Sequence, residues 1–180
     1  IGKFVCKRED GIRVTNTRGE QWCRDSLDIP AQDIYLDYIA MSMLDTDSYE
    51  SPGVDTDCDS LLYVGRLAPE KDLPVLLSAF HRVVQRRPDF ELFIVGDGPE
   101  RDTVEEMIHS LELSDSVVVK GVVPYEDLPA FYDRAGAVIL SSRRETFGRV
   151  VLEAFAYETP VVSTAARGPS ELIEDGETGA

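Results

Sequence analysis

From Leu61 to its end, the chain alternates apolar runs with stretches of helical periodicity, and this alternation constrains the fold more than any other feature. The predicted strands cover residues 61–65, 91–98, 117–121, 136–142 and 160–164. Apolar residues three and four apart predict helices between them, over residues 71–87, 100–113, 125–134, 149–158 and from 169 to 175. Strands that are apolar on both faces lie inside a parallel sheet covered by helices. We therefore predict an α/β fold with a Rossmann-like, doubly wound parallel sheet.

The first sixty residues are less regular. We expect a strand within 11–17, a helix over 18–27 and another strand within 32–41. Residues 45–60 are rich in Asp, Ser, Pro and Gly, which is typical of a linker. The predicted organisation is a remnant of one domain at 1–44, a linker at 45–60 and a second domain at 61–180. Because the chain begins with Ile1 and stops at Ala180, we expect a piece of a longer reading frame.

The charge balance excludes several partners. The chain has 34 acidic and 18 basic residues, a net charge of −16. So acidic a chain is repelled by nucleic acid and by anionic membranes, and no apolar run approaches the ~20 residues of a membrane-spanning helix. The three cysteines favour free thiols in a reducing cytoplasm. Any anionic ligand would need a local basic pocket.

Two Asp-Thr-Asp triplets, at 45–47 and 55–57, resemble a metal-binding motif. They lie in the predicted linker and not after a strand of the predicted sheet. The second triplet also begins like a calcium loop, but Ser60 replaces the glycine that such a loop requires. We therefore expect no metal site.

Glycines and cations follow the predicted strands. Gly65, Arg66 and Lys71 follow the first strand, and glycines or arginines follow the others. Ligands of doubly wound sheets bind at the carboxyl ends of the strands, and glycine lets a ligand approach the backbone closely. Cations at this edge of an acidic chain indicate an anionic ligand, and a phosphate is the natural candidate.

The predicted helix after Gly148 offers a second phosphate-binding element. The first amides of a helix lack partners within it and carry partial positive charge, so a phosphate can bind there. Arg66 and Lys71 would complete the cradle. Spacing alone is equally compatible with Arg66 and Lys71 being ordinary solvated charges and Gly148 merely starting a helix.

Glu145 and Glu153 form an E-x7-E pair. Glu145 precedes the predicted helix and Glu153 lies one to two turns inside it. Carboxylates accept hydrogen bonds from sugar hydroxyls, so the pair is a candidate sugar site. Two surface glutamates would give the same spacing in an acidic chain.

Five segments in order carry a resemblance to a known family. They are LLYVGRLAPEKDLPVLLSAF, FIVGDGPER, VVVKGVVPYEDLPAFYDRA, ETFGRVVLEAFAYETPVVST and ELIEDGETG. Together they resemble the donor-binding half of the retaining glycosyltransferases of group 1, or family 4, which have the GT-B fold. The resemblance covers residues 61–179. The preceding segment resembles the end of the first domain and the interdomain linker of that family, with its signature in two partial copies.

The resemblance assigns roles to individual residues. It implies that Arg66 and Lys71 bind the nucleotide diphosphate, that Glu145 contacts the donor sugar and that Glu153 contacts the ribose. The turn whose amides face sugar and phosphates would be Phe147, Gly148, Arg149 and Val150, although Arg149 stands where Leu or Ile is more common. The remaining donor-binding positions would be Gly65 after the first strand, and Gly98, Lys120, Gly121 and Val122 beside the nucleobase.

The resemblance also implies an activity. A hexosyl group would pass from a UDP-, GDP- or ADP-linked sugar to a sugar, lipid or other small-molecule acceptor, with retention at the anomeric carbon and no cofactor or obligatory metal. The further partner would be the missing N-terminal domain, so we expect these 180 residues to bind nucleotide but to transfer sugar poorly. Three alternatives remain: a nucleotide-sugar epimerase, a phosphorylase-like enzyme and a non-catalytic nucleotide-binding fragment. We expect a cytoplasmic protein, free or at the cytoplasmic membrane face.

Overall fold

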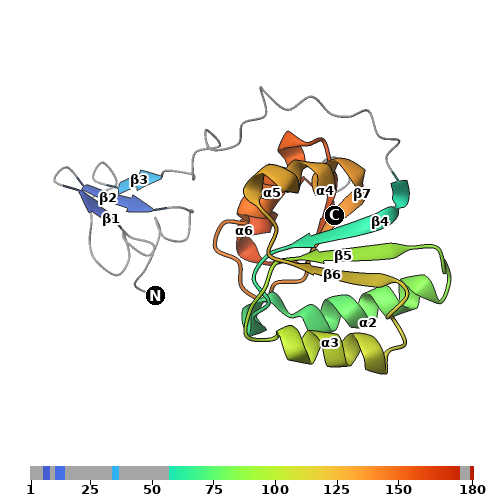
Figure 1. Cartoon of the computed structure of the whole chain (residues 1–180). Coiled ribbons are helices and arrows are strands. Elements are labelled where there is room, and N and C mark those ends of the chain that lie inside the picture. Colours follow the sequence, from blue (N-terminus) through green and yellow to red (C-terminus); the bar gives the residue numbers. More distant parts are fainter. Residues whose placement is uncertain (1–5, 9–10, 15–33, 37–56, 175–178) are drawn as a thin grey trace.

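The computed structural model describes residues 6–8, 11–14, 34–36, 57–174 and 179–180 (Figure 1). A small sheet contains β1 (Cys6–Arg8), β2 (Gly11–Val14) and β3 (Ile34–Leu36). Strand β2 pairs with β1 antiparallel and with β3 parallel. The strands predicted within 11–17 and 32–41 are thus present. The helix predicted over 18–27 and the linker residues 45–56 lie outside the described residues, and the proposed domain division stays a prediction.

The larger sheet has five parallel strands in the order β6-β5-β4-β7-β8. Numbered from β4 along the chain, this order is 3-2-1-4-5, that of a Rossmann-like sheet. The predicted fold class is therefore confirmed. The strands are β4 (Asp57–Val64), β5 (Glu91–Val95), β6 (Val117–Gly121), β7 (Ala135–Leu140) and β8 (Val161–Ser163).

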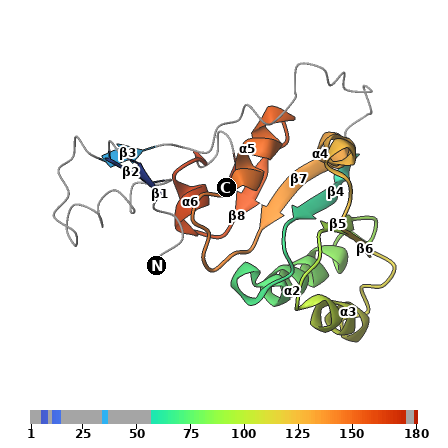
Figure 2. The same ribbon diagram turned by 60° about the vertical axis from the view of Figure 1, so that its left-hand side comes forward.

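Helices cover both faces of this sheet (Figures 1 and 2). One face carries α2 (Leu73–Val84) and α3 (Arg101–Ser110), whereas the other carries α4 (Leu128–Arg134) and α5 (Arg149–Ala156). Three short elements complete the domain: the 3-10 turns η3 (Pro69–Lys71) and η4 (Tyr125–Asp127), and helix α6 (Arg167–Ser170). No helix in the part of the chain described here is long and apolar enough to cross a lipid bilayer.

Strand alternation divides the core into two layers. Tyr63 and Ile94 belong to the cluster under α2 and α3, whereas their neighbours Leu62 and Val95 belong to the cluster under α4 and α5. Successive side chains of a strand point to opposite faces, so each strand fills both layers. This double burial explains why the strands are almost uniformly apolar.

Several boundaries differ from the prediction. The strand predicted over 91–98 ends at Val95, and the helix predicted from 169 to 175 is α6, Arg167–Ser170. Two further differences bear on the site. Strand β4 begins at Asp57, four residues before Leu61, where it pairs with Ala135 of β7. Helix α2 begins at Leu73 and not at 71, because Asp72 has a left-handed backbone, with φ of 50° and ψ of 47°. The predicted helix periodicity was right, but Lys71 belongs to the turn before the helix.

Candidate functional site

The site is defined by the reversal in strand order. Strands β4 and β7 are neighbours at the centre of the sheet, and the chain continues outward from β4 on one side and from β7 on the other. Loops leaving such neighbours diverge, which opens a crevice at their carboxyl ends where ligands of this fold bind. The loop after β4 carries Arg66 and Lys71, and the loop after β7 carries Glu145.

Lys71 and Glu145 meet across this switch point. The Lys71 ammonium forms an ion pair with Glu145 Oε2, and their side chains are only 21% and 19% exposed. The Thr146 amide donates to Glu145 Oε1 at 3.1 Å. The Ser141 hydroxyl donates to the Lys71 carbonyl at 2.7 Å. Two residues that the sequence places 74 positions apart therefore share one polar site, as the strand-end argument predicts.

Arg66 supplies a second cation at the same edge. Its side chain is exposed and forms no ion pair with another residue of the described part of the chain. Its carbonyl accepts a hydrogen bond from the buried Tyr63 hydroxyl at 3.0 Å. Burial raises the pKa of Tyr63, and the nearby charges of Glu145 and Glu70 raise it further. Tyr63 thus remains a neutral donor that fixes the loop carrying Arg66.

The turn before α5 is shaped by close backbone packing. Gly148 has φ of 81°, a left-handed conformation that favours glycine. No side chain caps the first turn of α5, so its amides remain available to a ligand. Behind the turn, a Cβ added at Gly168 would lie 2.6 Å from the Phe147 nitrogen. The start of α6 therefore packs directly on the buried Phe147, and Val150 packs on the α5 side of the core.

Glu153 is enclosed in a different environment. Its carboxylate is buried at 3% exposure. Arg149 Nε donates to Oε1 at 2.8 Å, and the Tyr132 hydroxyl donates to Oε2 at 2.7 Å. The Tyr132 ring stacks on Tyr157 with 5.4 Å between ring centroids. Burial raises the pKa of Tyr132, and the Glu153 charge adds to that increase. The unusual Arg149 therefore pairs with Glu153, one helical turn along α5.

The glycines after β4 and β5 serve backbone packing. A Cβ at Gly96 would lie 1.9 Å from the Gly65 carbonyl oxygen, and one at Gly98 would lie 2.2 Å from the Leu67 oxygen. The Gly96 amide donates to the Gly121 carbonyl at 2.8 Å. The close approach that we predicted for a ligand is here made by neighbouring loops, which hold three strand ends together.

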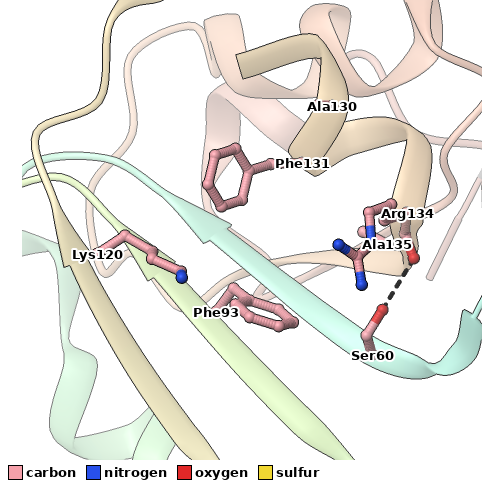
Figure 3. Close-up of a pocket in the computed structure, with 7 residues that line it drawn as sticks. All are labelled: Ser60, Phe93, Lys120, Ala130, Phe131, Arg134 and Ala135. Carbon is pink, nitrogen blue, oxygen red and sulfur yellow. Dashed lines mark hydrogen bonds between the residues drawn. The ribbon is translucent and has the colours of Figure 1, made fainter. Parts of the chain in front are cut away.

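The residues predicted to lie beside the nucleobase differ in burial and direction. Gly121 is buried and Val122 is 77% exposed, whereas Lys120 points toward the α4 side of the sheet. Its ammonium lies 5.8 Å from the centroid of the Phe93 ring. Lys120 and Phe93 line a cavity of about 170 Å³ beneath α4, together with Phe131, Arg134 and Ser60 (Figure 3). Ser60 pairs with Glu91, the first residue of β5, and Arg134 is the last residue of α4, so this cavity extends toward the amino ends of the strands, away from the switch point.

Sequence reasoning missed several polar residues around the site. Tyr132 is part of no recognised sequence motif, and it contacts Glu153, which lies 21 positions further along the chain. Asp72 and Arg143 form an ion pair between the two loops of the switch point. Ser142 is buried, and its hydroxyl makes no hydrogen bond with any residue that the structure describes. The only available signal was position, since Ser142 ends a predicted strand and Arg143 directly follows it.

Comparison with known proteins gives the class. The chain matches the family Glycosyl transferases group 1 over residues 46–180, and it belongs to that family. The alpha-D-kanosaminyltransferase of Streptomyces kanamyceticus is 31% identical over 98% of this chain and 48% of its own length. A D-inositol 3-phosphate glycosyltransferase of Frankia alni is 36% identical over 71% of this chain and 33% of its own length. The chain thus spans half or less of these relatives.

Solved structures agree on the fold. Anabaena HepE in complex with UDP-glucose superposes with a TM-score of 0.78 at 25% identity, over 94% of this chain and 49% of HepE. S. aureus TarM, whose crystal structure contains UDP, has a TM-score of 0.80 at 21% identity, over 94% of this chain and 33% of TarM. These likenesses confirm the Rossmann-like domain that the strand pattern predicts. The family match confirms the resemblance to group 1 glycosyltransferases.

Proposed function

We propose that this chain binds a nucleoside-diphosphate sugar, as the donor-binding part of a retaining glycosyltransferase that transfers a hexosyl group. The observation that carries the proposal is the ion pair of Lys71 with Glu145 at the switch point of the sheet. A cation next to a carboxylate suits a ligand that combines a phosphate with sugar hydroxyls. Family membership and the glycosyltransferase relatives support the same chemistry.

In the proposed reaction the bond between the anomeric carbon and the diphosphate oxygen breaks. The electron pair leaves with the nucleoside diphosphate, the acceptor oxygen bonds to the anomeric carbon, and the proton of the acceptor hydroxyl passes to the departing diphosphate. Arg66, Lys71 and the first amides of α5 would stabilise the charge that develops on the leaving group. Glu145 would orient the sugar, and retention without an obligatory metal follows the family resemblance.

A uridine nucleotide is the first ligand to test. HepE, at 25–26% identity, is solved with UDP and with UDP-glucose. Sugars and lipids remain the proposed acceptor classes, because the relatives include an inositol-phosphate glycosyltransferase and an alpha-monoglucosyldiacylglycerol synthase. GDP and ADP are the competing nucleotides.

Calorimetric titration with UDP, GDP and ADP tests the site. We expect one nucleotide to bind, and Arg66→Ala and Lys71→Ala to weaken it by about 10- to 100-fold each, the value of a lost charge-assisted contact. Arg82→Ala is the matched control, because Arg82 is an exposed cation in the last turn of α2, whereas Lys71 precedes the first turn. Equal binding by all four proteins would contradict the proposed phosphate cradle.

A further inference from the structure

Asp72 combines three properties that rarely occur together. It is buried, it is charged, and it adopts the left-handed conformation without being glycine. Such a backbone is unfavourable for a residue other than glycine and persists only where the surroundings impose it. Asp72 also precedes α2, where an aspartate usually caps the helix amides, but its side chain makes no capping hydrogen bond. Its carboxylate is directed elsewhere.

The partner of Asp72 is Arg143, from the loop after β7. Arg143 binds the carboxylate with two nitrogens, Nε to Oδ2 at 2.5 Å and Nη2 to Oδ1 at 3.1 Å. This two-pronged geometry is specific to arginine and fixes both direction and distance. The Arg143 amide also donates to the Glu70 carbonyl at 2.9 Å. Arg143 therefore holds the β4–α2 loop by its backbone and by its side chain.

These contacts hold the loop segment that carries Lys71. Glu70, Lys71 and Asp72 are consecutive, and each is bonded from the loop after β7: Glu70 and Asp72 by Arg143, and Lys71 by Ser141 and Glu145. The flexible side chain of Lys71 does not fix its ammonium by itself. The bonded loop sets where this side chain starts, and Glu145 binds its end. The two loops form one bonded unit across the switch point.

We propose that Asp72 and Arg143 are positioning residues, which hold the β4–α2 loop so that the Lys71 ammonium meets Glu145 in the geometry that the diphosphate sugar requires. The inference rests on the proposed function for its ligand. It makes an unusual prediction about charge. For an anionic ligand, simple electrostatics would make loss of Asp72 favourable and loss of Arg143 unfavourable, whereas positioning makes both losses unfavourable.

The binding test uses UDP-glucose and the full 180-residue chain. We expect Asp72→Gly and Arg143→Ala each to weaken binding by at least about fivefold, and the double variant to bind as weakly as either single variant, because both remove the same contact. Glycine also accepts the left-handed backbone, so Asp72→Gly removes the carboxylate without straining the turn. In a Lys71→Ala background, Arg143→Ala should have no further effect. Arg144→Ala is the matched control, an adjacent exposed arginine, and should bind within about twofold of wild type.

A second measurement needs no nucleotide. In the free protein, an NMR Overhauser contact between the Lys71 Hε and Glu145 Hγ protons should be present in wild type and Arg144→Ala. It should be lost in Asp72→Gly and Arg143→Ala. If Asp72→Gly fails to fold by its melting curve, Asp72→Asn, which also tolerates the left-handed backbone, replaces it.

The outcomes separate the two proposals. If wild type binds no nucleotide, the proposed function fails, and the Overhauser contact alone decides whether the positioning is correct. If Arg143→Ala weakens binding while Asp72→Gly leaves it unchanged or tightens it, Arg143 contacts the ligand directly and the positioning role is wrong. Persistence of the Lys71–Glu145 contact in both variants would also overturn it.

Discussion

The surroundings of Glu145 and Glu153 differ, although the two residues lie eight positions apart and belong to one sequence motif. Glu145 lies in a loop, is partly exposed, and faces a lysine across the switch point. Glu153 lies inside α5, where its two carboxylate oxygens are bound by Arg149 and Tyr132. The first is the residue for which we propose a contact with the donor sugar. The second joins α4 to α5, because Tyr132 comes from the one helix and Glu153 from the other.

Two residues of one sequence motif can therefore contribute very differently to stability. A partly exposed ion pair contributes little to stability, about 0–1 kcal/mol. A buried carboxylate that loses its partners, or a buried hydroxyl that loses its acceptor, is much more costly. Substitutions in the two environments should therefore separate binding from stability.

The largest expected difference is between Glu153→Ala and Glu145→Ala. Removing Glu153 leaves the buried Tyr132 hydroxyl without its acceptor and opens space beneath α5, so we expect a loss of about 3 kcal/mol in the free energy of unfolding. Removing Glu145 should cost less than about 1 kcal/mol but should weaken binding of the sugar nucleotide. Urea unfolding and calorimetry measure the two effects. Equal stability losses would show that the two environments do not differ as described.

The next effect compares the two buried tyrosines. Tyr132→Phe removes a hydrogen bond to a charged group and should cost about 1.5–3 kcal/mol, whereas Tyr63→Phe removes one to a carbonyl and should cost about 0.5–1.5 kcal/mol. Urea unfolding at pH 7 measures both. A larger loss for Tyr63→Phe would reverse the comparison.

Alkaline pH gives the same tyrosines a second test. Burial raises the pKa of both, so above the ordinary value of about 10 the unfolded chain has released a proton that the folded chain retains. Stability is therefore fully present below pH 10 and decreases as the pH rises above it. Each Phe variant should lose less stability than wild type between pH 9 and pH 11, by about 1 kcal/mol. Identical pH dependence in all three proteins would contradict the burial of these hydroxyls.

The smallest expected effect concerns Arg149. Its side chain is 57% exposed, so solvent screens its ion pair with the buried Glu153 carboxylate, and such a screened pair contributes about 0–1 kcal/mol. Its position at the start of α5 opposes the helix dipole and offsets part of that gain. The Tyr132 hydroxyl still donates to the carboxylate when Arg149 is removed, so Arg149→Leu should lower the free energy of unfolding by no more than about 1 kcal/mol. A loss as large as that of Glu153→Ala would make Arg149 the essential partner in place of Tyr132.

Much of the fold was predictable because its signals are local and repeated. Each strand of the large sheet contains a short apolar run, and the longer helices α2, α3 and α5 each have an apolar stripe. The meeting of Lys71 and Glu145 followed from the rule that strand ends share one edge. The start of α2 was not predictable, because the left-handed Asp72 is matched by an arginine 71 positions away.

The details of the site depend on contacts that a sequence pattern does not contain. Arg149 is oriented by its hydrogen bond to Glu153. Glu153 in turn accepts a hydrogen bond from Tyr132, which belongs to another helix. The glycines after β4 and β5 indicated ligand approach, yet Gly96 and Gly98 lie against the backbones of Gly65 and Leu67. In each case the sequence indicated that the residue was special, but it did not indicate which residue it contacts.

The contact between Gly168 and Phe147 has a consequence for trimming and redesign. The peptide at the start of α6 packs against the turn that leads into α5 and supports it, with no room for even a methyl group between them. Cutting the chain ahead of Arg167, or lengthening the connection from β8, would release that support although neither change touches a charged residue of the crevice. Any shortened or grafted version of this domain should therefore keep the strand-to-helix junction behind the turn intact.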